Sequence, residues 1–238
     1  MTKKSEGTLV GGLEDREGGA APRSPWPWWR SPWLYGLGAL VVFNLIYALP
    51  RYLSFDPTLS RTRIDPGFAL HYPVVVAHVV AGNVALVTVF IQLLPWVRRH
   101  RPGLHRLSGR VYVFAGVLPS SLLSLVLLPY STAPMGKLGL ATMAVLWIAT
   151  SLAGLRAARQ RRYVDHRRWM VYSFALAMGT SWGRVISQFA IPGNGIDVAV
   201  FFDISSWMGW VVSLVAAYLW LERTTPRRRA SAGRSVSS

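Results

Sequence analysis

Two ionisable residues, His78 and Arg184, stand in otherwise apolar segments of the sequence. Placing an arginine in the hydrocarbon core of a bilayer costs at least about 2.5 kcal/mol, so intramembrane residues of this kind are functional by default. An arginine binds anions, and a neutral histidine accepts hydrogen bonds, relays protons or ligates a metal. We therefore predict that His78 and Arg184 belong to a binding site. An ion pair that only fixes helix packing, with Asp203 as the acidic partner of Arg184, explains the same residues.

Two further histidines, His105 and His166, are each followed at once by arginine. We place both at the cytoplasmic starts of membrane helices, at matching depth. Two histidines on different helices are what a six-coordinate b-type haem requires, and the adjacent arginines suit its propionates. Histidine and arginine are also ordinary interfacial residues at the start of a membrane helix. The sequence leaves both interpretations open.

The elements that position these residues are predicted to be membrane helices. Of the 238 residues, 52% are hydrophobic and 15% are charged, whereas a typical soluble domain is about 25% charged. A membrane-spanning helix needs roughly 17–25 mostly apolar residues, and the chain supplies six such segments if Arg184 is tolerated in one of them. The expected fold is therefore all-α, a polytopic bundle of six transmembrane helices. The predicted spans are 33–50, 72–95, 111–129, 138–156, 168–190 and 204–221.

The membrane domain, residues 31–222, is expected to lie between two tails. Residues 1–30 are rich in glycine, serine and charge and lack apolar periodicity, which predicts a disordered cytoplasmic tail. Residues 223–238 are rich in arginine and serine and are predicted to be a disordered basic tail. Within the domain, Pro119 lies midway along the third span and should kink it.

The net charge of +16 follows from where the 26 lysines and arginines lie. If the amino terminus is cytoplasmic, 21 of them fall in cytoplasmic segments and 4 in outer loops, which leaves Arg184 inside a span. This asymmetry follows the positive-inside rule, so we expect both termini in the cytoplasm. Basic residues next to membrane helices attract anionic lipid. The expected partner is therefore the lipid bilayer, with anionic lipid at the cytoplasmic face, and not nucleic acid.

Helical phase predicts one inward polar face on the second span and one on the fifth. Seven residues nearly complete two turns, so residues at heptad steps share a face, and polar faces of membrane helices turn inward. His78 and Arg184 both fall on these faces, about 9 Å below the outer surface at 1.5 Å per residue. We expect them to face each other or a shared cavity. We interpret the serines and threonine as structural groups that hydrogen-bond across helices or back to carbonyls of their own helix. The faces consist of His71, His78, Ala85 and Gln92, and of His166, Ser173, Thr180, Arg184 and Ser187.

Three classes of function fit these residues. The first is a redox protein that carries haem b or handles a quinone, the second is a small anion or proton transporter or sensor, and the third is a membrane scaffold without chemistry. The chain has no cysteine, which excludes disulfides, thiol catalysis and thiolate-held clusters. It also contains no glycine-rich phosphate loop, nucleophile elbow or zinc-protease helix, so an enzyme of the soluble type is not expected.

The order of these motifs resembles the domain-of-unknown-function 2306 family of bacterial predicted membrane proteins. The resemblance covers about residues 72–190, four of the six spans, and departs at Leu93, where the family usually has an aromatic residue. It implies a multi-pass protein of the bacterial inner (plasma) membrane, and it singles out the same histidines and arginine. It implies no activity, because the family is uncharacterised. The motifs are His-Arg-Leu-Ser-Gly-Arg-Val-Tyr at 105–112, Trp147, His-Arg-Arg-Trp-Met at 166–170, and Ser-Phe-Ala-Leu at 173–176.

Overall fold

The computed structural model describes residues 32–60, 62–131, 136–190 and 198–224, and every regular element in these ranges is a helix. The predicted all-α class is therefore confirmed. Five long helices correspond to the first, second, fourth, fifth and sixth predicted spans. They are α1 (Pro32–Leu53), α2 (His71–Leu93), α6 (Lys137–Arg159), α7 (Tyr163–Ala190) and α8 (Val198–Thr224).

The third predicted span is a run of consecutive helical segments, and it begins earlier than expected. Its first segment starts at Pro102 and not near residue 111, because proline suits the first position of a helix, where its missing N–H is not needed. A short helix, α3 (Pro95–His100), forms the first part of the predicted loop, so His100 lies at a helix end. The segments are α4 (Pro102–Val111), the π-helix η3 (Tyr112–Val117), α5 (Leu118–Leu127) and the short 3₁₀ helix η4 (Leu128–Tyr130).

The irregularity predicted at Pro119 takes the form of this π-helix. Proline has no N–H to donate to the carbonyl one turn back. Just before it, the N–H of Leu118 donates to the carbonyl of Val113, five residues back, which is the π-helical pattern. The wider turn therefore ends where the proline begins, and α5 continues as a regular helix beyond it.

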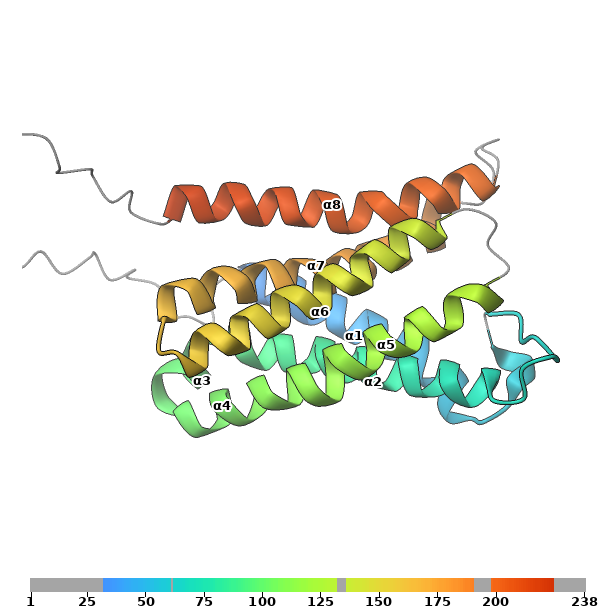
Figure 1. Ribbon diagram of the computed structural model, residues 1–238, viewed down its shortest axis with the longest axis horizontal. Coiled ribbons are helices and arrows are strands. Elements are labelled where there is room, and N and C mark those ends of the chain that lie inside the picture. Colours follow the sequence, from blue (N-terminus) through green and yellow to red (C-terminus); the bar gives the residue numbers. More distant parts are fainter. Residues whose placement is uncertain (1–31, 61, 132–135, 191–197, 225–238) are drawn as a thin grey trace, which may run out of the picture.

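The helices run side by side along the long axis of the molecule (Figure 1). Helix α7 packs against both α6 and α8, while α2 packs against α1 and α5. Buried side chains from α2, η3, α6 and α7 form the core, among them Val89, Tyr112, Trp147 and Leu176. At one end of the bundle lie α3, the start of α4, the α6–α7 connection and the end of α8, and at the other end lies the 54–70 connection (Figure 1).

By length and composition, five helical segments of the described chain can cross a membrane. Helix α7, which carries Arg184 in its second half, is not among them. The count of six spans and the orientation of the termini therefore stay predictions. The five segments are Pro32–Leu53, His71–Leu93, Pro102–Tyr130, Lys137–Arg159 and Ile204–Thr224.

Several predictions concern parts of the chain outside the described residues. The tail at residues 1–30 lies outside them, as does the second tail from residue 225 onward. The side chains of Ser187 and Asp203 also lie outside them, although their helices are described. The proposed pairing of Asp203 with Arg184 therefore stays a prediction.

Candidate functional site

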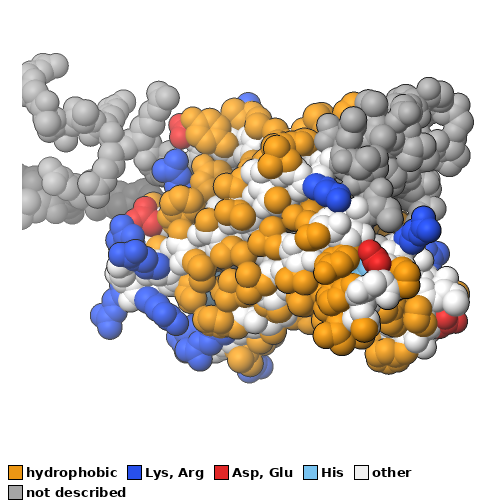
Figure 2. All heavy atoms as spheres, turned by 45° about the vertical axis from the view of Figure 1, so that its right-hand side comes forward, with side chains coloured by type: hydrophobic (Ala, Val, Ile, Leu, Met, Phe, Trp, Pro, Cys, Tyr) orange, Lys and Arg blue, Asp and Glu red, His pale blue; other side chains and the backbone are white. Residues whose placement is uncertain are grey.

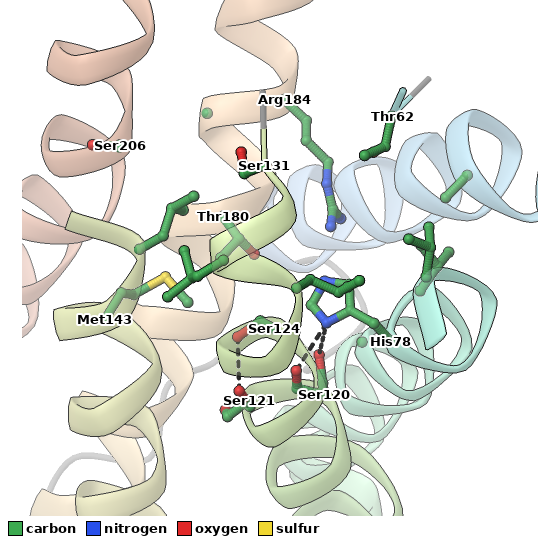
Figure 3. Close-up of a pocket in the computed structure, with 18 of the residues that line it drawn as sticks. Thr62, His78, Ser120, Ser121, Ser124, Ser131, Met143, Thr180, Arg184 and Ser206 are labelled. Carbon is green, nitrogen blue, oxygen red and sulfur yellow. Dashed lines mark hydrogen bonds between the residues drawn. The ribbon is translucent and has the colours of Figure 1, made fainter. Parts of the chain in front are cut away.

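A cavity of about 480 Å³ lies among helices α1, α2, α5, α6, α7 and α8, toward the end of the bundle that carries the 54–70 connection. Both His78 and Arg184 line it. Figure 3 shows the guanidinium of Arg184 pointing toward the ring of His78. The prediction from helical phase that these two residues share a cavity is therefore confirmed.

The ring of His78 is oriented by the backbone of α5. Its Nδ1 lies 2.8 Å from the carbonyl oxygen of Ser120 and 3.4 Å from the hydroxyl of the same residue (Figure 3). Because a carbonyl oxygen can only accept a hydrogen bond, Nδ1 must carry a proton. In the neutral ring the second nitrogen, Nε2, is then a hydrogen-bond acceptor.

The guanidinium of Arg184 is oriented by α1. Its Nη1 donates to Oδ1 of Asn44 at 2.9 Å. Asn44 has no exposed surface, and its Nδ2 donates to the carbonyl of Leu40 at 2.8 Å. This second bond fixes the amide so that its oxygen faces Arg184. Sequence reasoning missed Asn44, although a lone asparagine inside an apolar span is a signal that could have found it.

Hydroxyl groups of α5 and α7 add to the polar part of the cavity wall, and one of them has no partner. Ser121 lines the cavity and is 1% exposed, and its buried Oγ makes no hydrogen bond with the described residues. A buried polar atom without a partner costs about 1–3 kcal/mol. The other hydroxyls are those of Ser120, Ser124 and Thr180.

His71, on the same predicted face of α2 as His78, lines the cavity near the loop that precedes α2. Its Nδ1 accepts the backbone N–H of Asp65 at 2.9 Å, and its ring stacks on Phe68. The ring is 1% exposed. In this contact Nδ1 is an acceptor, so the proton of neutral His71 is on Nε2. His71 therefore connects the 54–70 segment to the bundle.

The inner histidines lie on the first turns of α4 and α7, as their position at helix starts predicts. Nδ1 of His166 lies 2.9 Å from the carbonyl of Gly154. Nδ1 of His105 is buried and has no partner among the described residues. The two rings are close enough to interact electrostatically. The cavity of His78 and Arg184 does not include either of them.

Three residues of the sequence motifs, Tyr112, Trp147 and Ser173, belong to a buried hydrogen-bond network at the centre of the bundle. The hydroxyls of Tyr112 and Ser173 are 2.6 Å apart, and Nε1 of Trp147 donates to the Tyr112 hydroxyl at 3.0 Å. Ser151 joins through Ser173 at 2.7 Å. The network ties η3, α6 and α7 together. The interpretation of Ser173 as a group that joins helices is therefore confirmed.

Gln92 makes a similar connection nearer the inner end. Its Nε2 donates to the carbonyl of His105 at 2.5 Å and to Oγ of Ser108 at 2.7 Å. Helix α2 is thereby joined to α4 at the turn that carries His105. Gln92 is 6% exposed, which agrees with its predicted place on the inward face of α2.

Comparison with known protein families decides where the chain belongs. The model of the family described as predicted membrane protein (DUF2306) matches residues 75–221. The chain belongs to this family. The match extends beyond residue 190, where the resemblance was expected to end, and includes most of α8, whereas α1 with Asn44 lies outside it. No curated protein and no solved structure matches the chain.

Proposed function

We propose that this multi-pass membrane protein lies in the bacterial inner membrane and binds a small organic anion in the cavity of His78 and Arg184, as a transporter or sensor. The observation that carries the proposal is the convergence of Arg184 and His78 on one cavity. A transporter, a sensor and an anion-regulated protein all need such a site, and binding is the property that they share.

The charge of the ligand is argued from Arg184. A guanidinium is permanently charged and presents a planar fork of N–H donors that matches a carboxylate or a sulfonate. Asn44 orients this group, and Figure 3 shows it directed into the cavity.

The size of the ligand is argued from the cavity. A volume of about 480 Å³ falls within the range of roughly 300–1,000 Å³ that is typical of sites for organic molecules. Much of the wall is apolar and includes Val75, Leu86, Leu127 and Met143. These features favour an organic anion with an apolar body over a single inorganic ion.

Binding of benzenesulfonate to the protein in lipid nanodiscs, measured by titration calorimetry, tests the proposal. Benzenesulfonate is a monovalent organic anion that stays ionised at any working pH. Arg184→Leu should weaken binding at least tenfold, about 1.4 kcal/mol. Arg223→Leu, which removes a positive charge from the last turn of α8 at the opposite end of the bundle, should leave it unchanged.

Arg184→Lys tests whether the positive charge itself contributes to binding, because it keeps a cation at the site. It should bind more weakly than the wild type and more tightly than Arg184→Leu, since Lys lacks the planar fork. Thermal unfolding of each variant checks that the bundle is intact. Equal binding by wild type and Arg184→Leu would contradict the proposed site.

A b-type haem held by His105 and His166 is the second candidate function, in a redox protein. The contact between Nδ1 of His166 and the Gly154 carbonyl favours it, because haem and metal ligands usually donate their second ring nitrogen in this way. Nδ1 of His105 has no such partner among the described residues, which fits a ligand less well. An absorbance spectrum of protein expressed with added haem decides it: a Soret band that His105→Ala or His166→Ala abolishes would support the haem.

A further inference from the structure

We infer that the cavity takes up one proton together with the anion, and that the proton binds to Nε2 of His78. The ligand class is then a monovalent organic acid, bound as its anion plus a proton. This inference rests on the proposed function, since it describes how the same cavity treats its ligand.

The first step is the fixed tautomer of His78. Nδ1 is committed to the Ser120 carbonyl at 2.8 Å, so the ring can gain a proton at Nε2 alone. Figure 3 shows the ring on the cavity side of α2, with Arg184 directed toward it. The protonation of His78 and the charge state of the cavity are therefore coupled through space.

The second step is the electrostatic linkage between the bound anion and His78. A negative charge beside a histidine ring favours the imidazolium form, because the two charges attract each other. An anion held between Arg184 and the ring accepts a hydrogen bond from a protonated Nε2. Anion binding therefore favours proton binding, and by reciprocity proton binding strengthens anion binding.

The third step is to compare His78 with the other titratable groups that face the cavity. Among the described lining residues these are Tyr47 and Tyr52 on α1, His71 on α2 and Arg184 on α7, while α5, α6 and α8 contribute no titratable side chain. Tyrosine and arginine side chains already carry their protons at neutral pH, so neither can take up another. Protonating His71 would remove the acceptor that binds the N–H of Asp65. His78 is therefore the group that fits proton uptake.

Titration calorimetry with benzenesulfonate, in two buffers of different ionisation enthalpy, tests the inference. The sulfonate stays ionised, so any proton taken up on binding must go to the protein. Between the pH at which His78 titrates in the free protein and the higher pH at which it titrates in the complex, the wild type should take up as much as one proton per anion. Across the titration of the site, the Kd should rise by up to about tenfold per pH unit as the pH increases.

His78→Gln should still bind benzenesulfonate but take up no proton, because a glutamine amide can donate to the Ser120 carbonyl and does not titrate. His100→Gln, at the exposed end of α3, is the matched control and should behave as the wild type.

Wild-type binding without proton uptake between about pH 5.5 and 8.5 would overturn the inference, and that measurement needs no variant. Uptake that persists in His78→Gln, or that disappears in His71→Gln, would also overturn it. Failure of the wild type to bind benzenesulfonate would overturn the proposed function itself.

Discussion

At the scale of single residues, Asn44 and Asn83 form a natural pair. Both are buried, and each donates its Nδ2 to the carbonyl four residues back at 2.8 Å. They differ at Oδ1, which accepts from Arg184 in Asn44 and is buried without a described partner in Asn83. The contribution of the contact to Arg184 can therefore be isolated by comparing the same substitution at both positions.

We predict that Asn44→Leu lowers the free energy of unfolding by about 1.5–3 kcal/mol more than Asn83→Leu does. A hydrogen bond to a charged group contributes about this amount, and losing it leaves a half-buried guanidinium with one partner fewer. Asn44→Leu should also weaken benzenesulfonate binding, because Arg184 loses its orientation. Denaturant unfolding in detergent micelles measures the first effect and calorimetry the second. Equal destabilisation by the two variants would show that the Asn44–Arg184 bond contributes little.

The same residues show what sequence could predict about the site. A charge within an apolar run identifies His78 and Arg184, and helical phase places them on inward faces of helices that prove to share a cavity. The contact between Asn44 and Arg184 spans 140 positions of the chain. It depends on how α1 lies against the rest of the bundle, which no local periodicity specifies.

At the scale of helices, the backbones of α7 and α8 approach each other closely at two glycines, Gly179 and Gly209. A Cβ added at Gly179 would lie 2.5 Å from Cα of Trp210, and one added at Gly209 would overlap the carbonyl oxygen of Gly179. Small residues at such positions let membrane helices approach closely, which gains packing and dispersion energy. Gly36 on α1 is the contrasting case, because a Cβ there would meet nothing within 4 Å.

We predict opposite effects of alanine at these two glycines. Gly179→Ala should destabilise the protein by about 1–3 kcal/mol, the usual cost of forcing an extra carbon into a packed contact. Gly36→Ala should be neutral or stabilising by about 0.5–1 kcal/mol, because alanine has the higher helix propensity. Thermal unfolding of both variants beside the wild type measures the difference. A Gly179→Ala protein as stable as Gly36→Ala would mean that α7 and α8 can separate without cost.

Helix existence could be predicted from the sequence more fully than helix ends could. Uncharged runs located five of the six long helical regions, because a span of the required length must be apolar, and the sixth was located by allowing Arg184 within it. They placed the start of the third region near residue 111, whereas the helix begins at Pro102. The reason is that the first part of this helix, α4, contains His105 and three other charged or hydroxyl residues. The charged residues therefore mark where the helix leaves the hydrocarbon core of the membrane, and the helix itself continues beyond that point. The π-helix η3 could not be predicted in form, since Pro119 specifies a missing N–H but not how the helix accommodates it.

At the scale of the whole molecule, positive charge gathers at one end. Figure 2 shows lysine and arginine side chains around the end formed by α3, α4 and the α6–α7 connection, next to a broad hydrophobic surface. Burial lowers the pKa of Arg98 in α3, and the nearby charges of Arg167 and Arg99 lower it further. Anionic lipid headgroups would relieve this crowding of cations. We propose that this end lies at the cytoplasmic face and binds anionic lipid, with both termini on the same side.

Reporter fusions test this orientation. A reporter joined after Arg99, Lys137 or Arg162 should read cytoplasmic, periplasmic and cytoplasmic respectively, because arginine-rich connections are retained inside. Arg162 is the informative site, because it lies in the short α6–α7 connection, where it pairs with Asp165 at 3.4 Å, and a fusion there reports whether α6 crosses the membrane. A periplasmic signal there would contradict both the orientation and the crossing of α6. The predicted pattern would instead place the cavity of His78 and Arg184 in the periplasmic half of the bilayer, so its anion and proton would come from the periplasmic side.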